Sequence, residues 1–458
     1  MLFSSLTFLL YFLPGVVILH RLLPGGWQNL FLLAASLVFY AWGEAKYLPL
    51  IAALLLLNWA LGLWLGLGRG RRLAMALGIA LNIGVLGFYK YAGFFCRTVG
   101  LARLAPQTTL PLGISFFTFQ TLAYLIDVYR KEIAPEKNPV DFSAFILLFP
   151  QLIAGPIIRY SDLKNELHSR RRPAAPALER GMALFIGGLS LKVLLANPLG
   201  ELWAAFGGGQ GEGVCSLLAL AGYGLQIYYD FFGYSLMAMG VGAMLGFTIP
   251  RNFNHPYAAA SITDFWRRWH ITLSGWFRDY VYIPLGGNRV GRARWVLNLV
   301  IVWGLTGLWH GAAWNFVAWG LYFAAFLLLE KLFLGRWLKR VPMLGHVYVL
   351  LAALFSFVLF DAASVPAALE TAGGLLGLGG LPLWDSGALY YLRSYAPVLA
   401  LAAVGSTPLP AALCRRIAAG RAGRVLDALE PAALLALLAV CTAFLVSGSA
   451  NPFLYFRF

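Results

Sequence analysis

The stretch WVLNLVIVWGLTGLWHGAAWNFVAWGLYFAAFLLL, from Trp295 to Leu329, contains no Asp, Glu, Lys or Arg and indicates the fold class. As one continuous helix its roughly 35 residues would be about 52 Å long, against a hydrocarbon core of ~30 Å. It therefore cannot be a single upright membrane span. Gly304, Gly307 and Gly311 offer places to break it, which puts His310 near a discontinuity within the membrane. An ionisable side chain at that depth is costly and indicates function or a specific buried partner.

The composition extends this interpretation to the whole chain. Hydrophobic residues make up 60% of the 458 residues and charged residues 12%, about half the usual ~25% of globular proteins. Apolar runs follow one another with no soluble domain between them. We therefore predict an all-α, polytopic membrane protein, a single domain over 1–458, with about 11 spans plus short or re-entrant helices. The opening segment, Leu2–Leu23, lacks a basic n-region and is predicted to be a retained membrane segment.

The net charge of +16 lies mainly in short loops between the apolar runs, as in the arginine groups at 69–72, 170–172 and 289–294. This is the pattern of cytoplasmic loops in membrane proteins. Anionic lipid headgroups and a phosphate-bearing cytosolic donor are the expected partners, and nucleic acid is not. The four cysteines are scattered without metal-ligand spacing, so the sequence predicts neither a disulfide framework nor a metal site.

The segment SITDFWRRWHITLSGWFRDYVYIPLGG, Ser261–Gly287, mixes aromatic and charged residues between strongly apolar neighbours. On one continuous helix, Trp266, His270 and Phe277 would share a face. Asp264 has the spacing to pair with the two arginines that follow it. The pattern fits an interfacial amphipathic helix. It equally fits a re-entrant wall of an active-site tunnel, with His270 inward and the arginines near an anionic donor.

Histidine, with an ordinary pKa of ~6.5, suits a general base for an alcohol hydroxyl at neutral pH. We therefore predict His310 and His270 as catalytic residues. Asp230 and Asn315 either orient the imidazoles or cap helix breaks. The predicted substrate-binding residues are Arg267, Arg268, Trp309, Asn315 and Asp230. The sequence contains no GxSxG, GxxxxGK[ST] or HExxH motif, so these nucleophile, phosphate-loop and zinc chemistries are not indicated.

Long motifs carry a family resemblance. NFNHPYAAASITDFWRRWHITLSGWFRDYVYIPLGGNR (Asn252–Arg289) and GLWHGAAWNFVAWGLY (Gly307–Tyr322) resemble the core of bacterial membrane-bound O-acyltransferases, most nearly the alginate O-acetyltransferase group. The resemblance implies that His270 and His310 form the active-site pair, with His310 the more central. It also implies a ring of helices around a thinned centre, and a separate extracytoplasmic, serine-hydrolase-like acetyltransferase as partner.

One departure concerns the acceptor. Phe232 and Leu236 stand where alginate acetylases typically have serine and aspartate, and Leu236 is closer to the teichoic acid D-alanyl transfer branch.

The predicted reaction is transfer of an acyl group, in the first instance acetyl, for O-acetylation of an extracytoplasmic polysaccharide. The donor is a cytosolic thioester, either acetyl-CoA or an acyl carrier protein, and no permanently bound cofactor is expected. The expected location is the bacterial inner membrane. D-Alanyl transfer to a cell-wall polymer, a proton-coupled transporter and a non-catalytic scaffold are the alternatives.

Overall fold

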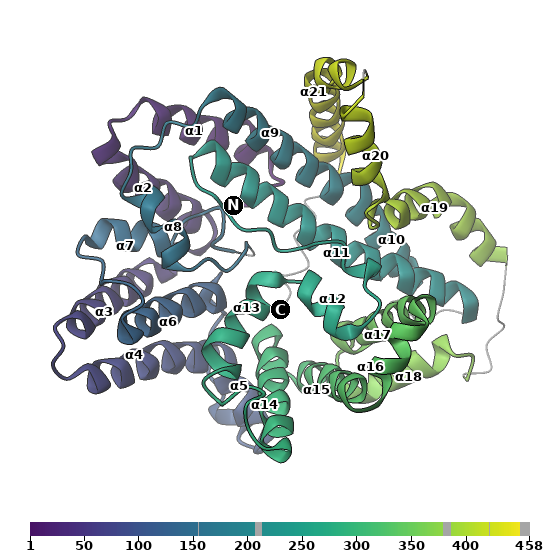
Figure 1. Ribbon diagram of the computed structural model, residues 1–458, viewed down its shortest axis with the longest axis horizontal. Coiled ribbons are helices and arrows are strands. Elements are labelled where there is room, and N and C mark those ends of the chain that lie inside the picture. Colours follow the sequence, from purple (N-terminus) through teal and green to yellow (C-terminus); the bar gives the residue numbers. More distant parts are fainter. Residues whose placement is uncertain (154, 207–212, 379–385, 421, 449–458) are drawn as a thin grey trace. The chain divides into compact units, whose positions relative to one another are not determined.

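The computed structural model describes residues 1–153, 155–206, 213–378, 386–420 and 422–448, and every regular element in these ranges is helical (Figure 1). This confirms the predicted all-α class. Six helical stretches are long and apolar enough to span a membrane: Gly25–Gly66, Arg71–Thr98, Ala175–Ala205, Trp314–Arg340, Pro342–Asp361 and Gly423–Ser447. A bent pair, Leu389–Gly405 with Leu409–Ala418, makes a seventh if it is one span. The count of 11 spans and the ring around a thinned centre stay predictions.

The described chain divides into two compact units, and one comprises Met1–Phe185 and Tyr234–Arg251. Its elements are η1 (Phe8–Phe12), α1 (Leu13–Leu22), α2 (Gly25–Glu44), η2 (Ala45–Tyr47), α3 (Leu48–Gly66), α4 (Arg71–Leu86), η3 (Gly87–Tyr91), α5 (Ala92–Thr98), η4 (Ala102–Leu104), α6 (Ile114–Arg130), α7 (Pro139–Ile146) and α8 (Tyr160–Leu167). Helices α9 (Ala175–Ser190) and α11 (Gly213–Met244) contribute residues to both units.

The first unit contains the apolar stretch 142–158, in which Pro150, Gly155 and Pro156 offer places for a turn. Helix α7 ends at Ile146, and residues 147–153 and 155–159, which precede α8, are irregular and largely buried. The described part of this stretch is therefore not one continuous helix. Its passage through the membrane as a re-entrant loop stays a prediction.

The second unit comprises Ile186–Gly233 and the part of the chain that follows Arg251. It contains η5 (Leu191–Ala196), α10 (Asn197–Ala205), η6 (Pro256–Ala258), α12 (Ile262–Arg268), α13 (Ile271–Phe277), η7 (Arg278–Tyr282), α14 (Arg292–His310), α15 (Trp314–Leu329), η8 (Glu330–Leu334), α16 (Gly335–Arg340), α17 (Pro342–Asp361), α18 (Val365–Leu375), α19 (Ser386–Gly405), α20 (Leu409–Ala418) and α21 (Gly423–Ser447). Both predicted catalytic histidines belong to this unit.

The exposed surface of the long helices is strongly apolar. On α21 only 6% of the most apolar window is buried inside the chain, and Leu435 and Val446 are each more than 60% exposed. Such surface is stable against lipid and would be unfavourable against water. The exposed leucines and valines therefore support a membrane environment for these helices.

Candidate active site

The helical hairpin α14–α15 positions His310. Helix α14 ends at this residue, Gly311 continues in an extended conformation, and α15 begins at Trp314. The two helices run antiparallel and very close together. A Cβ atom added at Gly307 would lie 2.2 Å from the carbonyl oxygen of Phe316, and one at Gly320 would lie 2.1 Å from that of Trp303. The predicted discontinuity in Trp295–Leu329 is confirmed, because α14 ends at His310 and α15 begins at Trp314. Only small residues such as these glycines allow the two backbones to approach this closely.

Aromatic rings enclose the His310 imidazole, which is 6% exposed. Its ring centroid lies 5.0 Å from that of Trp309, 4.9 Å from that of Trp319 and 5.4 Å from that of Phe360. All three rings are steeply inclined to the imidazole, in edge-to-face contacts that hold its orientation. Such an enclosure excludes bulk water, which would otherwise compete as an acyl acceptor.

His270 lies between two short helices and not within one. Helix α12 ends at Arg268, α13 begins at Ile271, and His270 itself adopts the left-handed conformation with a φ of 44°. The expectation that Trp266, His270 and Phe277 share one face of a continuous helix is therefore wrong. Left-handed backbone is unusual for a residue with a Cβ and is maintained by tertiary contacts, which local periodicity does not report.

Asn252 supplies those contacts. Its carbonyl oxygen, Oδ1, lies 3.2 Å from Nδ1 of His270 and also accepts hydrogen bonds from the backbone NH and hydroxyl of Thr272. The Asn252 backbone oxygen accepts from the NH of Ile271 at 3.0 Å. Because Oδ1 is an acceptor, Nδ1 of His270 is the donor, and the ring nitrogen available as a base is Nε2.

Trp309 contacts both histidines. Its ring centroid lies 5.9 Å from that of His270 and 5.0 Å from that of His310, so one indole connects the predicted catalytic pair. Phe231 also packs against His270, with the ring centroids 4.7 Å apart. The structure thus gathers two residues forty positions apart at one buried aromatic cluster.

The two arginines predicted to bind substrate lie on α12 and differ in their surroundings. Nε of Arg268 pairs with Oδ2 of Asp264 at 2.9 Å, which confirms the predicted local pairing. Arg267 is exposed and lines two cavities. One cavity, of about 920 Å³, also carries Lys331, Arg336 and Lys339 in its wall.

The second cavity, of about 240 Å³, is mostly apolar and shares Thr263, Arg267 and Lys331 with the first. Its wall includes Trp266 and Trp303, and Thr306, which precedes His310 by one turn of α14. The Trp266 ring lies 5.7 Å from the Trp319 ring, and that ring in turn contacts His310. Trp266 thus links the wall of the smaller cavity, through Trp319, to the aromatic enclosure of His310.

Glu330, which the sequence analysis did not single out, holds α12 in place. It is 5% exposed, and its carboxylate accepts hydrogen bonds from the backbone NH groups of Ile262 and Thr263 and from the Thr263 hydroxyl. A carboxylate at a helix N-terminus satisfies NH groups that have no partner within the helix. Because Glu330 follows α12 by more than sixty residues, the sequence offers no local signal of this contact.

The remaining two predicted site residues have structural partners. The Asn315 amide donates to the carbonyl oxygens of Leu359 and Ala362, at the end of α17. Asp230, on α11, forms a buried ion pair with Lys192 of η5. The Asn315 contacts match the alternative that such residues cap helix breaks, whereas Asp230 lies in the interior of α11. A substrate-binding role for either residue stays a prediction.

We expect Asn252 to act as a positioning residue for His270. Asn252→Ala removes the acceptor of the His270 Nδ1 proton, and loss of one such hydrogen bond should lower acyl transfer about 10- to 100-fold. Asn252→Asp retains an acceptor oxygen and should recover part of the rate. The measurement is kcat and KM for the acyl donor in purified protein, with Asn254→Ala, at an exposed neighbour, as control. Equal rates in the Ala and Asp variants would contradict the positioning role.

A multi-span helical protein with two buried histidines at one aromatic cluster, and a basic cavity in the same unit, has the features of a membrane-embedded group-transfer enzyme. The sequence model of the membrane-bound O-acyltransferase family matches residues 128–365, which include both histidines. The chain belongs to this family and is a multi-pass membrane O-acyltransferase. This confirms the predicted enzyme class over the transporter and the scaffold.

Three relatives illustrate the range of the family. The chain is 38% identical to a probable alginate O-acetylase of Azotobacter vinelandii over 402 residues, 84% of this chain and 80% of the relative. It is 33% identical to a peptidoglycan O-acetyltransferase of Helicobacter pylori over 428 residues, 84% of this chain and 81% of the relative. It is 31% identical to a teichoic acid D-alanyltransferase of Bacillus subtilis over 244 residues, 50% of this chain and 60% of the relative.

Proposed function

We propose that the protein transfers an acetyl group from a cytosolic thioester, acetyl-CoA or an acyl carrier protein, for O-acetylation of an extracytoplasmic polysaccharide. The observations that carry the proposal are the three residues shared by the basic and the apolar cavity and the ring contacts that lead from Trp266 through Trp319 to His310. A donor of this kind carries phosphate at one end, then a long arm, then the reactive thioester carbonyl. The basic cavity, the apolar cavity and His310 would meet these parts in the same order. The bacterial inner membrane is the corresponding location, since the donor and the acceptor lie on opposite sides of it.

The charge of the larger cavity supports binding of the donor phosphate. Arg267, Lys331, Arg336 and Lys339 line it together with two carboxylates, Asp264 and Glu330. Both carboxylates are engaged, Asp264 with Arg268 and Glu330 with the first NH groups of α12. The basic side chains therefore give this wall its electrostatic character and favour an anion. Arg268 is already paired with Asp264, so it would influence donor binding only through the position of α12, the helix that carries both residues.

The smaller cavity suits the arm that carries the thioester. Leu299, Val302 and Leu327 provide apolar walls, and Trp266 and Trp303 provide flat aromatic ones. Apolar pockets with a few polar groups fix an elongated ligand mainly by excluding water. In the proposal the thioester lies at the inner end of this cavity, near the Trp319 side of His310.

The chemistry requires a base and a water-excluding environment. His310 takes the proton of the attacking hydroxyl, whose oxygen forms a bond to the thioester carbonyl carbon. The tetrahedral intermediate then collapses, the carbon–sulfur bond breaks, and the thiolate receives the proton held by His310. His270, with Nδ1 fixed by Asn252, belongs to the same aromatic cluster, and its Nε2 orients or polarises the reacting groups.

The acceptor is proposed to receive the acetyl group through a relay. A polymer outside the membrane is too large to enter an enclosure of buried aromatic rings. A smaller hydroxyl group, for example on an extracytoplasmic, serine-hydrolase-like acetyltransferase partner, is a sterically simpler first acceptor. The relatives act, by their names, on alginate, peptidoglycan and teichoic acid. These are extracytoplasmic polymers, so an exopolysaccharide or a cell-wall glycan is the proposed final acceptor. Because Leu236 is closer to the teichoic acid branch of the family, D-alanyl transfer to a cell-wall polymer is the second candidate function.

Removing the cations shared by both cavities should weaken donor binding. The double variant Arg267→Gln and Lys331→Gln should raise KM for acetyl-CoA roughly 10- to 100-fold, because a hydrogen bond to a charged group contributes about 1.5–3 kcal/mol. kcat at saturating donor should change little, since neither side chain takes part in the proposed proton transfer. Initial rates of CoA release check this, with the exposed Arg415→Gln as control. An unchanged KM would exclude the basic cavity as the donor site.

A further inference from the structure

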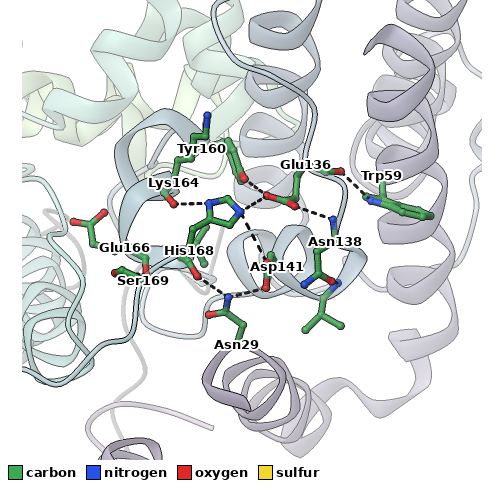
Figure 2. A network of polar contacts seen from close by, with 12 residues as sticks. Asn29, Trp59, Glu136, Asn138, Asp141, Tyr160, Lys164, Glu166, His168 and Ser169 are labelled. Atoms are coloured by element: carbon green, nitrogen blue, oxygen red, sulfur yellow. Dashed lines mark hydrogen bonds and ion pairs between the residues drawn. The ribbon is translucent and has the colours of Figure 1, made fainter. Parts of the chain in front are cut away.

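A cluster of three potential metal ligands lies in the first unit, away from the residues assigned to acyl transfer. Glu136 precedes α7, Asp141 lies in the first turn of α7, and His168 follows the last residue of α8 (Figure 2). Nε2 of His168 lies 2.8 Å from Oε2 of Glu136 and 4.0 Å from Oδ2 of Asp141. All three ligand atoms lie within 4.8 Å of one another.

The orientation of the imidazole is set by a contact outside the cluster. Nδ1 of His168 donates to the backbone carbonyl of Lys164 at 2.9 Å. In neutral histidine this leaves the lone pair on Nε2, the nitrogen that faces both carboxylates. A lone pair directed at two carboxylates is favourable only with a positive charge between them. Histidines that bind metals are typically oriented in this way, by a backbone carbonyl on the opposite nitrogen.

The carboxylates are oriented by similar outer contacts. Oε1 of Glu136 accepts from the backbone NH of Asn138 at 2.8 Å, and Oδ1 of Asp141 accepts from the Asn29 amide at 2.7 Å. These bonds leave the other oxygens, Oε2 and Oδ2, directed toward His168 (Figure 2). The Tyr160 hydroxyl adds a donor to Oε2. Each of the three side chains thus has one polar atom that bonds to a residue outside the cluster and another that faces the other two ligands.

We propose that Glu136, Asp141 and His168 bind a divalent transition-metal ion of the zinc type. For a tetrahedral ion with bonds of ~2.0–2.2 Å, two ligand atoms lie about 3.3 Å apart. The two nitrogen–oxygen separations, 2.8 and 4.0 Å, bracket this value. An imidazole among the ligands favours transition metals over Mg²⁺ or Ca²⁺.

The partial burial of the cluster fits an ion with three protein ligands and one open position. The Glu136 side chain is 6% exposed, whereas that of His168 is 43% exposed, so ions and water can reach the centre from one side. Three protein ligands leave a fourth position for water. The ion would tie the start of α7 to the end of α8. It would thereby hold residues 147–153 and 155–159 between them, most of which are buried.

Zinc binding to the full-length protein tests the proposal. Protein purified in detergent through a tag without histidine is stripped with a chelator, dialysed, and titrated with ZnCl₂ by calorimetry. Metal content after dialysis is measured by mass spectrometry. We expect one Zn²⁺ per chain. His168→Gln should weaken binding at least about 100-fold, since loss of a ligand costs at least as much as loss of an outer contact.

Two further variants control for folding and for unspecific histidine binding. Asp141→Asn preserves the side-chain shape and the 2.8 Å contact between His168 and Glu136, yet should weaken Zn²⁺ binding at least tenfold. His346→Gln should bind as wild type, although His346 makes the same kind of Nδ1 contact, to the carbonyl of Ala259. Absence of stoichiometric binding in the wild-type protein, or equal binding in all variants, would identify the cluster as an imidazolium–carboxylate ion pair and overturn the proposal.

Discussion

Replacing His310 with alanine should reduce acyl transfer to the background of membranes that lack the protein. Loss of a general base typically costs roughly 10²- to 10⁴-fold in rate. The aromatic enclosure offers no substitute, because Trp309, Trp319 and Phe360 have no group that accepts a proton at neutral pH. The measurement is release of CoA thiol and transfer of labelled acetyl by purified protein at saturating acetyl-CoA.

The control distinguishes chemistry from folding. His346→Ala removes a histidine from the same unit and should retain the wild-type rate. The His310→Ala protein should elute from size-exclusion chromatography as wild type, because the smaller side chain creates no clash. A rate within threefold of wild type would remove His310 from the mechanism, whatever the behaviour of His270.

Substituting Gly307 should have a similarly large effect, through the backbone. A Cβ atom at this position would lie 2.2 Å from the Phe316 carbonyl oxygen, which belongs to a helix and cannot move independently. Gly307→Ala should therefore separate α14 from α15 and displace His310, at a cost of about 1–3 kcal/mol or more for overpacking. We expect a lower thermal inactivation midpoint and a severe loss of acyl transfer.

Gly304 provides the matched control on the same helix. A Cβ atom there would meet no atom within 4 Å, and alanine is favoured over glycine in helices by roughly 0.5–1 kcal/mol. Gly304→Ala should thus leave the midpoint unchanged or raise it. If Gly307→Ala behaves in the same way as Gly304→Ala, the close packing of this hairpin does not position the active site.

The parts of the site predicted from the sequence are those encoded locally. The length of the uncharged run Trp295–Leu329 exceeds one span, and its glycines mark where it turns, so the position of His310 at a helix end follows from physical limits on length. Asp264 and Arg268 pair because they are four residues apart on one helix. Long motifs also indicate the family, because they preserve this arrangement as a unit.

Contacts between distant segments could not be predicted in this way. His270 takes up a left-handed conformation that Asn252 stabilises from eighteen residues upstream, so helical periodicity through Ser261–Gly287 was misleading. Glu330 contacts α12 across sixty-seven residues, and Lys192 reaches Asp230 across thirty-eight. Both cavities arise from such tertiary contacts. A single sequence without homologues provides no signal for them.

The protein is proposed to move an acyl group from a cytosolic thioester to the other side of the membrane, with His310 as the base. Inverted membrane vesicles expose the cytoplasmic face, so radiolabelled acetyl-CoA added outside is available only from that side. Label is then followed into acceptors enclosed in the lumen. Wild-type vesicles should consume the thioester and accumulate enclosed O-acetyl label, and His310→Ala vesicles should do neither. Equal enclosed label in both, or an intact donor in the wild type, would contradict the account.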